Sequence, residues 1–303
     1  MRLKAICLSA LLAFALVGTS VADDALQPFV LAFTASGSLD DTAAQVKDKV
    51  TAAGFEVVGS YSPYDGAMII VVTSDDLKKA AASTDDGGYG AAERISLTNV
   101  DGEVQVAYTN PIYWGNAYRL EDTGSLNAAA SKLESALGKQ QAFGAGKKEL
   151  TAKDLRKYHY MFGMEKFDDP SELAEYDSYA DAVAAVEKGL SAGAGGAQKV
   201  YRIDIPGKDE TVFGVALTDE GCSGDEYIMS RIDKDPLRAT AHLPYEILVS
   251  GGDVYALYGR FRIAISFPYL PMMASKTGAT FFNIMCAPNA IEEALTQAAG
   301  GEI

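Results

Sequence analysis

The chain has 303 residues, of which 48% are hydrophobic and 22% are charged. This composition excludes collagen-like, low-complexity and disordered chains, because it holds enough apolar side chains for a packed core. The formal net charge of -15 argues against nucleic acid and anionic membrane surfaces as partners, since both attract basic faces. A chain of this length is expected to form one large or two ordinary domains.

The first 22 residues have the layout of a secretory signal peptide. Arg2 and Lys4 precede an apolar run over residues 5–17, and residues 20–22 form a small-x-small cleavage site. The run is shorter than the ~20 apolar residues that a bilayer span needs. We therefore predict a signal peptide at residues 1–22 and a mature chain that is periplasmic or secreted, with no membrane insertion after cleavage. An uncleaved N-terminal anchor is the alternative.

The rest of the chain shows one order of patterns twice. Ser38 and Ser178 each precede a helical pattern in which apolar residues recur at spacings of four, three and four. Serine is a favoured N-cap, so each pattern predicts an amphipathic helix that begins after its serine. Two strand patterns follow each helix. They cover residues 55–61 and 67–73 in the first half, and residues 199–205 and 211–218 in the second.

A hairpin pattern and a last helix complete each half. The hairpins pair residues 94–98 with 104–108, and residues 254–258 with 261–266. Asp101-Gly102 and Gly259-Arg260 suit tight turns between these strands. Each hairpin is expected to end before a proline, Pro111 or Pro268, because proline does not sit in a central strand. A helical pattern follows each proline.

This recurrence predicts an internal duplication. We expect two related α+β domains at residues 27–138 and 172–299, joined by a linker at residues 139–171. Each domain is expected to be an α/β sandwich, in which a small mixed or antiparallel sheet carries helices on one face.

Several short segments of the second half resemble the domain of unknown function 302 family. They are Val212-Phe213-Gly214-Val215-Ala216-Leu217, Asp235-Pro236, Leu243-Pro244-Tyr245 and Phe267-Pro268. The first half, with residues 68–72 and 93–99 and Asn110-Pro111, is similar to a weaker member. The resemblance implies a compact, self-associating α/β sandwich with no established reaction. The family often carries Cys-Asn-Pro and Leu-Pro-Cys where this chain has Leu217-Thr218-Asp219 and Leu243-Pro244-Tyr245, so no thiol-based role is implied.

Two cysteines, Cys222 and Cys286, remain after cleavage of the signal peptide. In an oxidising compartment such a pair is a candidate disulfide. The alternative is two buried, reduced thiols that act as small hydrophobic side chains, and the choice stays open because sequence supplies no geometry.

The linker begins with a basic stretch. Residues 139–157 hold six Lys and Arg side chains against two Asp and Glu side chains. Such a stretch can pair with the acidic domains or bind an anion, but we favour a solvated hinge. Just after it, His159, Met161 and Met164 carry soft and imidazole ligands of the kind that Cu(I) prefers. Neither a helix nor a strand brings all three to one face, so apolar packing is the favoured interpretation and copper is the alternative.

The usual catalytic signatures are absent: no G-x-S-x-G, P-loop or H-E-x-x-H motif occurs. We therefore predict no catalytic residues. Asp219-Glu220 and Asp225-Glu226 flank Cys222, and this acidic loop would hold a hard cation only weakly, so we interpret it as solvated. The remaining histidine, His242, is expected to be structural.

Aromatic side chains near the two prolines are candidates for a ligand site. They are Tyr113, Trp114, Tyr258 and Tyr269. Core packing is the default for such residues, since a pocket also needs convergent polar groups. Tyr113 and Trp114 are expected to occupy the place that Leu270 and Pro271 hold in the second half. A ligand site, if present, is expected where the segments after the hairpins meet the linker.

These features predict an exported, non-catalytic binding or accessory protein, whose partner is a small ligand or another protein. One alternative is a periplasmic copper-binding protein that uses His159, Met161 and Met164. The other is an enzyme built on carboxylates, which would show a carboxyl group of raised pKa in a cleft.

Overall fold

A computed structural model describes residues 25–303, and the predicted signal peptide lies outside this range. The elements of the first half are β1 (Phe29–Ser36), α1 (Leu39–Ala52), β2 (Glu56–Tyr61), β3 (Ala67–Thr73), α2 (Asp75–Ala82), the 3-10 helix η1 (Gly87–Gly90), β4 (Glu93–Val100), β5 (Glu103–Thr109), α3 (Pro111–Ala117) and α4 (Thr123–Leu137). The linker holds β6 (Gln141–Phe143) and α5 (Ala152–Leu155).

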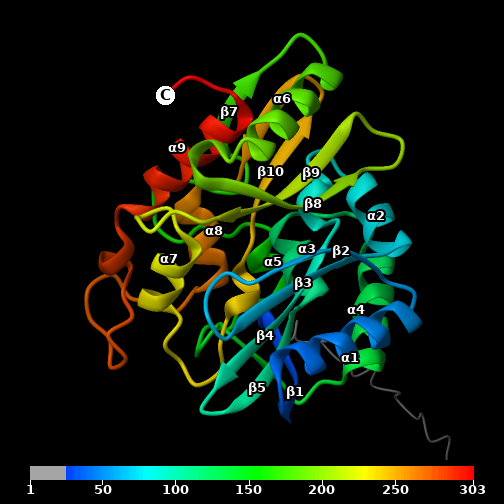
Figure 1. The fold of residues 1–303 in the computed structure, drawn as a ribbon, viewed down its shortest axis with the longest axis vertical. Coiled ribbons are helices and arrows are strands. Elements are labelled where there is room, and N and C mark those ends of the chain that lie inside the picture. Colours follow the sequence, from blue (N-terminus) through cyan, green and yellow to red (C-terminus); the bar gives the residue numbers. More distant parts are fainter. Residues whose placement is uncertain (1–24) are drawn as a thin grey trace, which may run out of the picture.

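The second half repeats this order. Its elements are β7 (Ser171–Glu175), α6 (Tyr179–Ser191), η2 (Ala194–Gly196), β8 (Ala197–Asp204), β9 (Glu210–Leu217), α7 (Asp225–Ile232), η3 (Thr240–His242), β10 (Tyr245–Ser250), β11 (Asp253–Ala256), α8 (Gly259–Ser266), η4 (Phe281–Ile284) and α9 (Ala287–Ala299). In Figure 1 the second half lies above the first, and α9 and α1 lie at opposite ends of the molecule.

Both sheets are antiparallel throughout and share one strand order. The first runs β2-β3-β4-β5-β1-β6, and the second runs β8-β9-β10-β11-β7. Each strand of the second half therefore takes the place of its counterpart in the first, and β6 of the linker adds one strand. The predicted α+β class is confirmed, with antiparallel rather than mixed sheets.

Helices cover one face of each sheet, as the apolar spacing predicts. Side chains of α1 and α4 form a core with one face of the first sheet, and α6 and α9 lie against the second sheet. The two predicted N-caps are present: Ser38 accepts a hydrogen bond from the backbone of Asp41, and Ser178 accepts one from Asp181.

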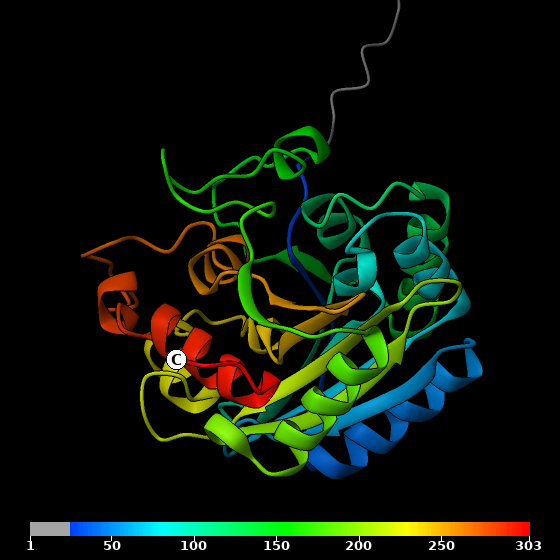
Figure 2. The same cartoon turned by 90° about the horizontal axis from the view of Figure 1, so that it is seen from above.

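The two halves meet like the subunits of a two-fold dimer. The edge strand β2 contacts its counterpart β8, while η1 contacts β9 and β10 and, reciprocally, η3 contacts β3 and β4. Both edge strands carry a bulge at this contact, at Val58 and Val200. Gly59 lies where a Cβ atom would come within 2.3 Å of the Val200 carbonyl oxygen, so glycine permits the close approach. Figure 2 shows both edge strands running alongside each other.

Charged side chains fill part of the space between the sheets. Arg94 of β4 donates to Glu246 of β10, and Arg262 of α8 donates to the same carboxylate over 3.2 Å. All three side chains are buried, so a single carboxylate pairs with two guanidinium groups in the interior. Apolar side chains of both halves join around them in one cluster, and the halves therefore share a core.

The predicted second hairpin is wrong. Residues 254–256 pair with β10 across a turn at Gly251-Gly252, and residues 259–266 form the helix α8. A short apolar run such as Phe261–Ser266 fits a helix as well as a strand, so its periodicity does not decide. Counted from their N-caps, α8 corresponds to α3, and Tyr113 and Trp114 correspond to Phe261 and Arg262 rather than to Leu270 and Pro271.

The linker is not a solvated hinge. Its β6 pairs with β1, and its Leu155 and Tyr158 side chains are buried. Arg156 donates to Asn116 and to the carbonyl oxygens of Arg119 and Leu120, at the end of α3. These contacts fix the linker to the first half, and the Tyr158 hydroxyl donates to the Ala264 carbonyl oxygen of the second half. Within residues 25–303 no helix is long and apolar enough to cross a bilayer.

Candidate functional site

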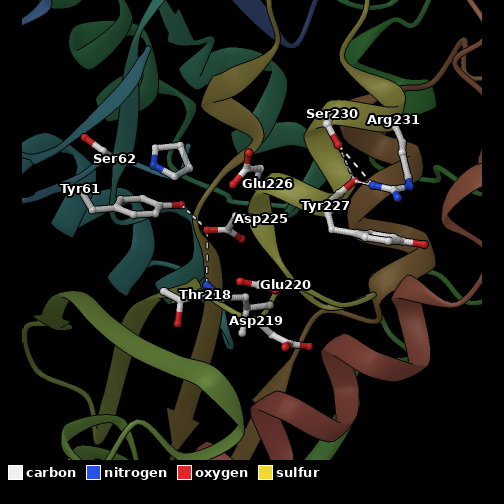
Figure 3. A pocket seen from close by; sticks show the side chains of 12 residues that line it. Tyr61, Ser62, Thr218, Asp219, Glu220, Asp225, Glu226, Tyr227, Ser230 and Arg231 are labelled. Atoms are coloured by element: carbon white, nitrogen blue, oxygen red, sulfur yellow. Dashed lines mark hydrogen bonds between the residues drawn. The ribbon is translucent and has the colours of Figure 1, made fainter. Parts of the chain in front are cut away.

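A pocket of about 450 Å³ opens where the two halves meet at the end of β2. One wall is Tyr61, Ser62 and Pro63, which end β2 and begin its loop. The opposite wall is residues 217–220 after β9, together with the first two turns of α7. Figure 3 shows that Tyr61 reaches across the pocket toward Asp225.

Asp225 is the central group of this pocket. Its side chain is only 2% exposed, although it belongs to the first turn of α7. The Tyr61 hydroxyl donates to its Oδ2 atom over 2.8 Å, and the Leu217 backbone amide donates to the same oxygen over 3.4 Å. The other oxygen, Oδ1, is buried and has no hydrogen-bond partner among residues 25–303. One acceptor atom of this side chain thus has no hydrogen-bond partner among the described residues.

Burial raises the pKa of Asp225 from 3.8 to about 7, although the hydrogen bonds from Tyr61 and Leu217 act in the opposite direction. Burial, with the nearby Asp225 carboxyl, also raises the pKa of Tyr61 well above its usual value, so this phenol stays a donor. Asp225 therefore changes charge near neutral pH, which an exposed aspartate does not do.

Further charges line the pocket. Asp219, Glu220 and Glu226 add carboxyl groups to its walls. The one cationic side chain of this lining is Arg231, whose guanidinium lies 3.5 Å above the Tyr227 ring and donates to the Tyr227 carbonyl oxygen. The pocket is thus predominantly acidic.

The loop before α7 is held tightly. Cys222 forms a disulfide with Cys286, which precedes α9, whereas the sequence left the choice between a disulfide and two reduced thiols open. At Gly224 a Cβ atom would lie 1.8 Å from the Asp219 carbonyl oxygen, so only glycine fits this close turn. Both features fix residues 219–224 against the rest of the second half and shape the far wall of the pocket.

The corresponding junction, where the β8–β9 loop of the second half meets η1 of the first, is closed by a lysine. Lys208 donates to the Thr84 carbonyl oxygen, and its Nζ atom lies 3.7 Å from Asp85 and 3.8 Å from Glu210. Glu210 is buried and also accepts from the Gly88 amide over 2.7 Å. An ammonium of the chain itself thus neutralises the carboxylates of this second junction.

The structure does not bring the four predicted ligand-binding aromatics together in one pocket. Tyr113 and Trp114 are 0% and 2% exposed. Tyr113 donates to the Ile265 carbonyl oxygen and Trp114 to that of Pro28, so both polar atoms have partners. The reason is the position of α3, which inserts between the sheets and gives these rings to the core.

Tyr258 and Tyr269 are half-buried. The Tyr258 hydroxyl accepts from Arg260, and Tyr269 lies against Gly146 of the linker. Between the linker and the segment after α8, where the sequence pointed to a ligand site, a smaller apolar pocket is present, but neither tyrosine lines it.

His159, Met161 and Met164 line one open hollow of about 830 Å³. Four basic side chains, Arg119, Arg156, Lys157 and Lys166, line it together with the carboxylates of Asp168 and Asp169, so basic groups outnumber acidic ones. Copper binding by these three residues stays a prediction. Among residues 25–303 no group of three or more His, Cys, Asp or Glu side chains converges as metal ligands.

Sequence reasoning identified the acidic loop but missed Tyr61 and the burial of Asp225. The only signal was the position of Asp225 on the face of α7 that also carries Ile228, Met229 and Ile232, all buried. Tyr61 lies 164 residues away, and no local pattern links the two.

Comparison with protein-family models, with curated proteins and with solved structures found no match for this chain. The resemblance to the domain of unknown function 302 family therefore stays a prediction.

Proposed function

We propose that this is an exported, non-catalytic binding protein for a small organic ammonium, held in the acidic pocket between the two halves. The observation that carries the proposal is the buried Oδ1 atom of Asp225, which lines the pocket and has no partner among the described residues. A buried carboxylate oxygen without a donor costs free energy, and a charged N–H group that reaches it recovers that cost.

The surroundings select a cation. Asp219, Glu220 and Glu226 carry negative charge into a pocket of about 450 Å³, which suits a small molecule. Since the chain has a net charge of -15, its field also attracts cations from solution. The Tyr61 hydroxyl keeps the Asp225 carboxyl in place, so its bare oxygen is preorganised for a donor.

The lysine-closed junction supports an ammonium in particular. There Lys208 places a primary ammonium between a backbone carbonyl oxygen and the carboxylates of Asp85 and Glu210. At the pocket the end of β2 brings Tyr61 and the following loop brings Tyr64, which forms a hydrogen bond with Thr240. A ligand ammonium would fill the role that Lys208 fills at the corresponding junction.

The experiment is isothermal titration calorimetry with putrescine and butylamine as probes, at pH 5.5 and pH 8. Because the pKa of Asp225 is about 7, the carboxyl must lose its proton to pair with an ammonium. We expect binding at pH 8 and an affinity about thirtyfold weaker at pH 5.5, with proton release at the lower pH.

Asp225→Asn is expected to remove most of the affinity together with its pH dependence. The matched control is Glu103→Gln, which neutralises an exposed carboxylate on the β4–β5 hairpin and should leave binding unchanged. Equal binding by the Asp225→Asn variant, or binding of Ca²⁺ in place of both amines, would contradict the proposal.

A second candidate is acid–base catalysis, which the pKa of Asp225 near 7 favours. In that case Asp225 would exchange a proton with a substrate group at its Oδ1 atom. A panel of nitrophenyl esters, phosphates and glycosides tests it, and hydrolysis that the Asp225→Asn variant loses at pH 7 would support it over simple binding.

A further inference from the structure

A second pocket, of about 230 Å³, lies between the linker and α8 with the segment that follows it. The linker contributes Tyr158, Met161 and Met164, and the other wall includes Ile263, Leu270 and Met272. The lining is therefore largely apolar. Its volume is slightly below the ~300–1,000 Å³ of most ligand pockets, so it suits a small molecule.

Apolar side chains also surround this pocket on the surface. Met161 and Met272 are 44% and 50% exposed, and their neighbours Phe162 and Met273 are 96% and 78% exposed. Large apolar side chains rarely gather on the surface of a soluble protein without a binding role. Methionine side chains are flexible and adapt to the shape of an apolar ligand.

Two cationic side chains line the same pocket. Lys148 of the linker is exposed. Arg260 of α8 donates through Nη2 to Glu165 over 2.7 Å and to Tyr258 over 3.0 Å, whereas its Nε atom is buried without a partner among residues 25–303. An N–H donor of a guanidinium is thus left over beside an apolar space, and it is complementary to a carboxylate.

We propose that this apolar pocket binds a small amphipathic monocarboxylate, such as a medium-chain fatty acid. The chain would lie among Met161, Met164 and Met272, with the carboxylate at Arg260 and Lys148. The inference is independent of the acidic pocket, which shares no lining residue with this one.

The test is titration of the purified chain with decanoate, followed by calorimetry and by NMR of ¹³C-methyl methionine. We expect the methyl signals of Met161, Met164 and Met272 to shift, and that of Met68 on β3 to stay in place. Decanol and decylamine carry the same apolar chain without a carboxylate, and we expect both to bind at least about tenfold more weakly.

Variants separate binding in the pocket from binding by the exposed apolar patch around it, which comprises Met161, Phe162, Met272 and Met273. Met164→Trp should fill the pocket and abolish decanoate binding, while Met273→Trp, which changes an exposed residue outside the lining, should not. Arg260→Met should weaken decanoate about tenfold and leave decanol unchanged.

Equal affinity for decanoate and decylamine, or methionine signals that do not move, would overturn the proposal. So would a chain that sediments as a dimer, becomes monomeric with Phe162→Ser and Met273→Ser, and binds no decanoate. That result would assign the patch to contacts between copies of the chain.

Discussion

At one junction between the halves the loop after β8 brings Lys208 to the carboxylates of Asp85 and Glu210. At the other the end of β2 brings Tyr61 to Asp225. The loops after β8 and β2 hold equivalent places in the repeated topology, and each meets the opposite half next to its 3-10 helix. One junction is therefore neutralised from within the chain. The other keeps a buried carboxyl group with a bare oxygen and a pocket in front of it.

In our proposal, this difference assigns ligand binding to one of two equivalent junctions and stability to the other. Lys208 with Glu210 acts as a clamp, because the buried Glu210 carboxyl has both the ammonium and the Gly88 amide as partners. Asp225 lacks such a cation, so its protonation responds to pH and, in our proposal, to a ligand. Changes at either junction test this division.

The largest effect is expected from loss of the disulfide. Replacing Cys222 and Cys286 by alanine opens a link across 64 positions and should lower the free energy of unfolding by up to about 4 kcal/mol. Chemical denaturation measures the change. Since the bond also holds the far wall of the acidic pocket, putrescine affinity should fall in the same variant. An unchanged affinity would show that the pocket wall is independent of the bond.

A smaller loss is expected at the lysine-closed junction. Lys208→Met leaves the buried Glu210 carboxyl without its cation and should cost about 2 kcal/mol of unfolding free energy in urea titrations. Lys78→Met is the matched control, because its partner Glu56 is exposed and such a pair contributes little. Equal losses of unfolding free energy in both variants would contradict a stabilising role of the Lys208–Glu210 pair.

A lysine placed beside Asp225, in imitation of Lys208 at the other junction, should block ligand binding in the acidic pocket. Ser62→Lys places an ammonium in the β2–β3 loop, where residue 62 lines the pocket. We expect putrescine to bind about tenfold more weakly at pH 8, a change of about 1.4 kcal/mol, because the side chain competes for Asp225. Ser62→Met, of similar length but uncharged, is the control, and a comparable loss there would point to steric blocking instead.

A last prediction concerns the pH dependence of the free energy of unfolding. The pKa of Asp225 is about 7 in the folded chain against 3.8 in its usual state. As the pH rises from 4 to 7, the unfolded chain loses this proton first, so the free energy of unfolding falls across that window. Asp225→Asn should remove this contribution, so that the variant gains free energy of unfolding relative to the parent between pH 4 and pH 8. Parallel unfolding curves at both pH values would disprove it.

Much of the fold was predictable because local patterns determine it. The helices after Ser38 and Ser178 show apolar periodicity behind a capping serine, and the β4–β5 hairpin carries Asp101-Gly102 at its turn. The repeat of this order indicated the duplication. Residues 259–266 were misassigned, because their helix forms where α8 inserts into the shared core, and that packing is a long-range property.

The candidate site was less predictable. The disulfide partners and the acidic residues around Cys222 were visible in the sequence. That Asp225 is buried depends on Tyr61 from the other half, and a contact between residues so far apart leaves no local signature. Likewise the basic linker suggested solvent exposure, whereas Arg156 is held by carbonyl oxygens at the end of α3.

The close approach at Gly59 has a consequence for solubility. β2 and β8 are the outer strands of their sheets, and outer strands tend to recruit strands from other molecules. Here β2 and β8 cover each other's exposed edge, since their backbones meet at Gly59, where a methyl group would not fit. A larger residue at position 59 would push β2 and β8 apart and expose two edge strands, which would then promote intermolecular aggregation.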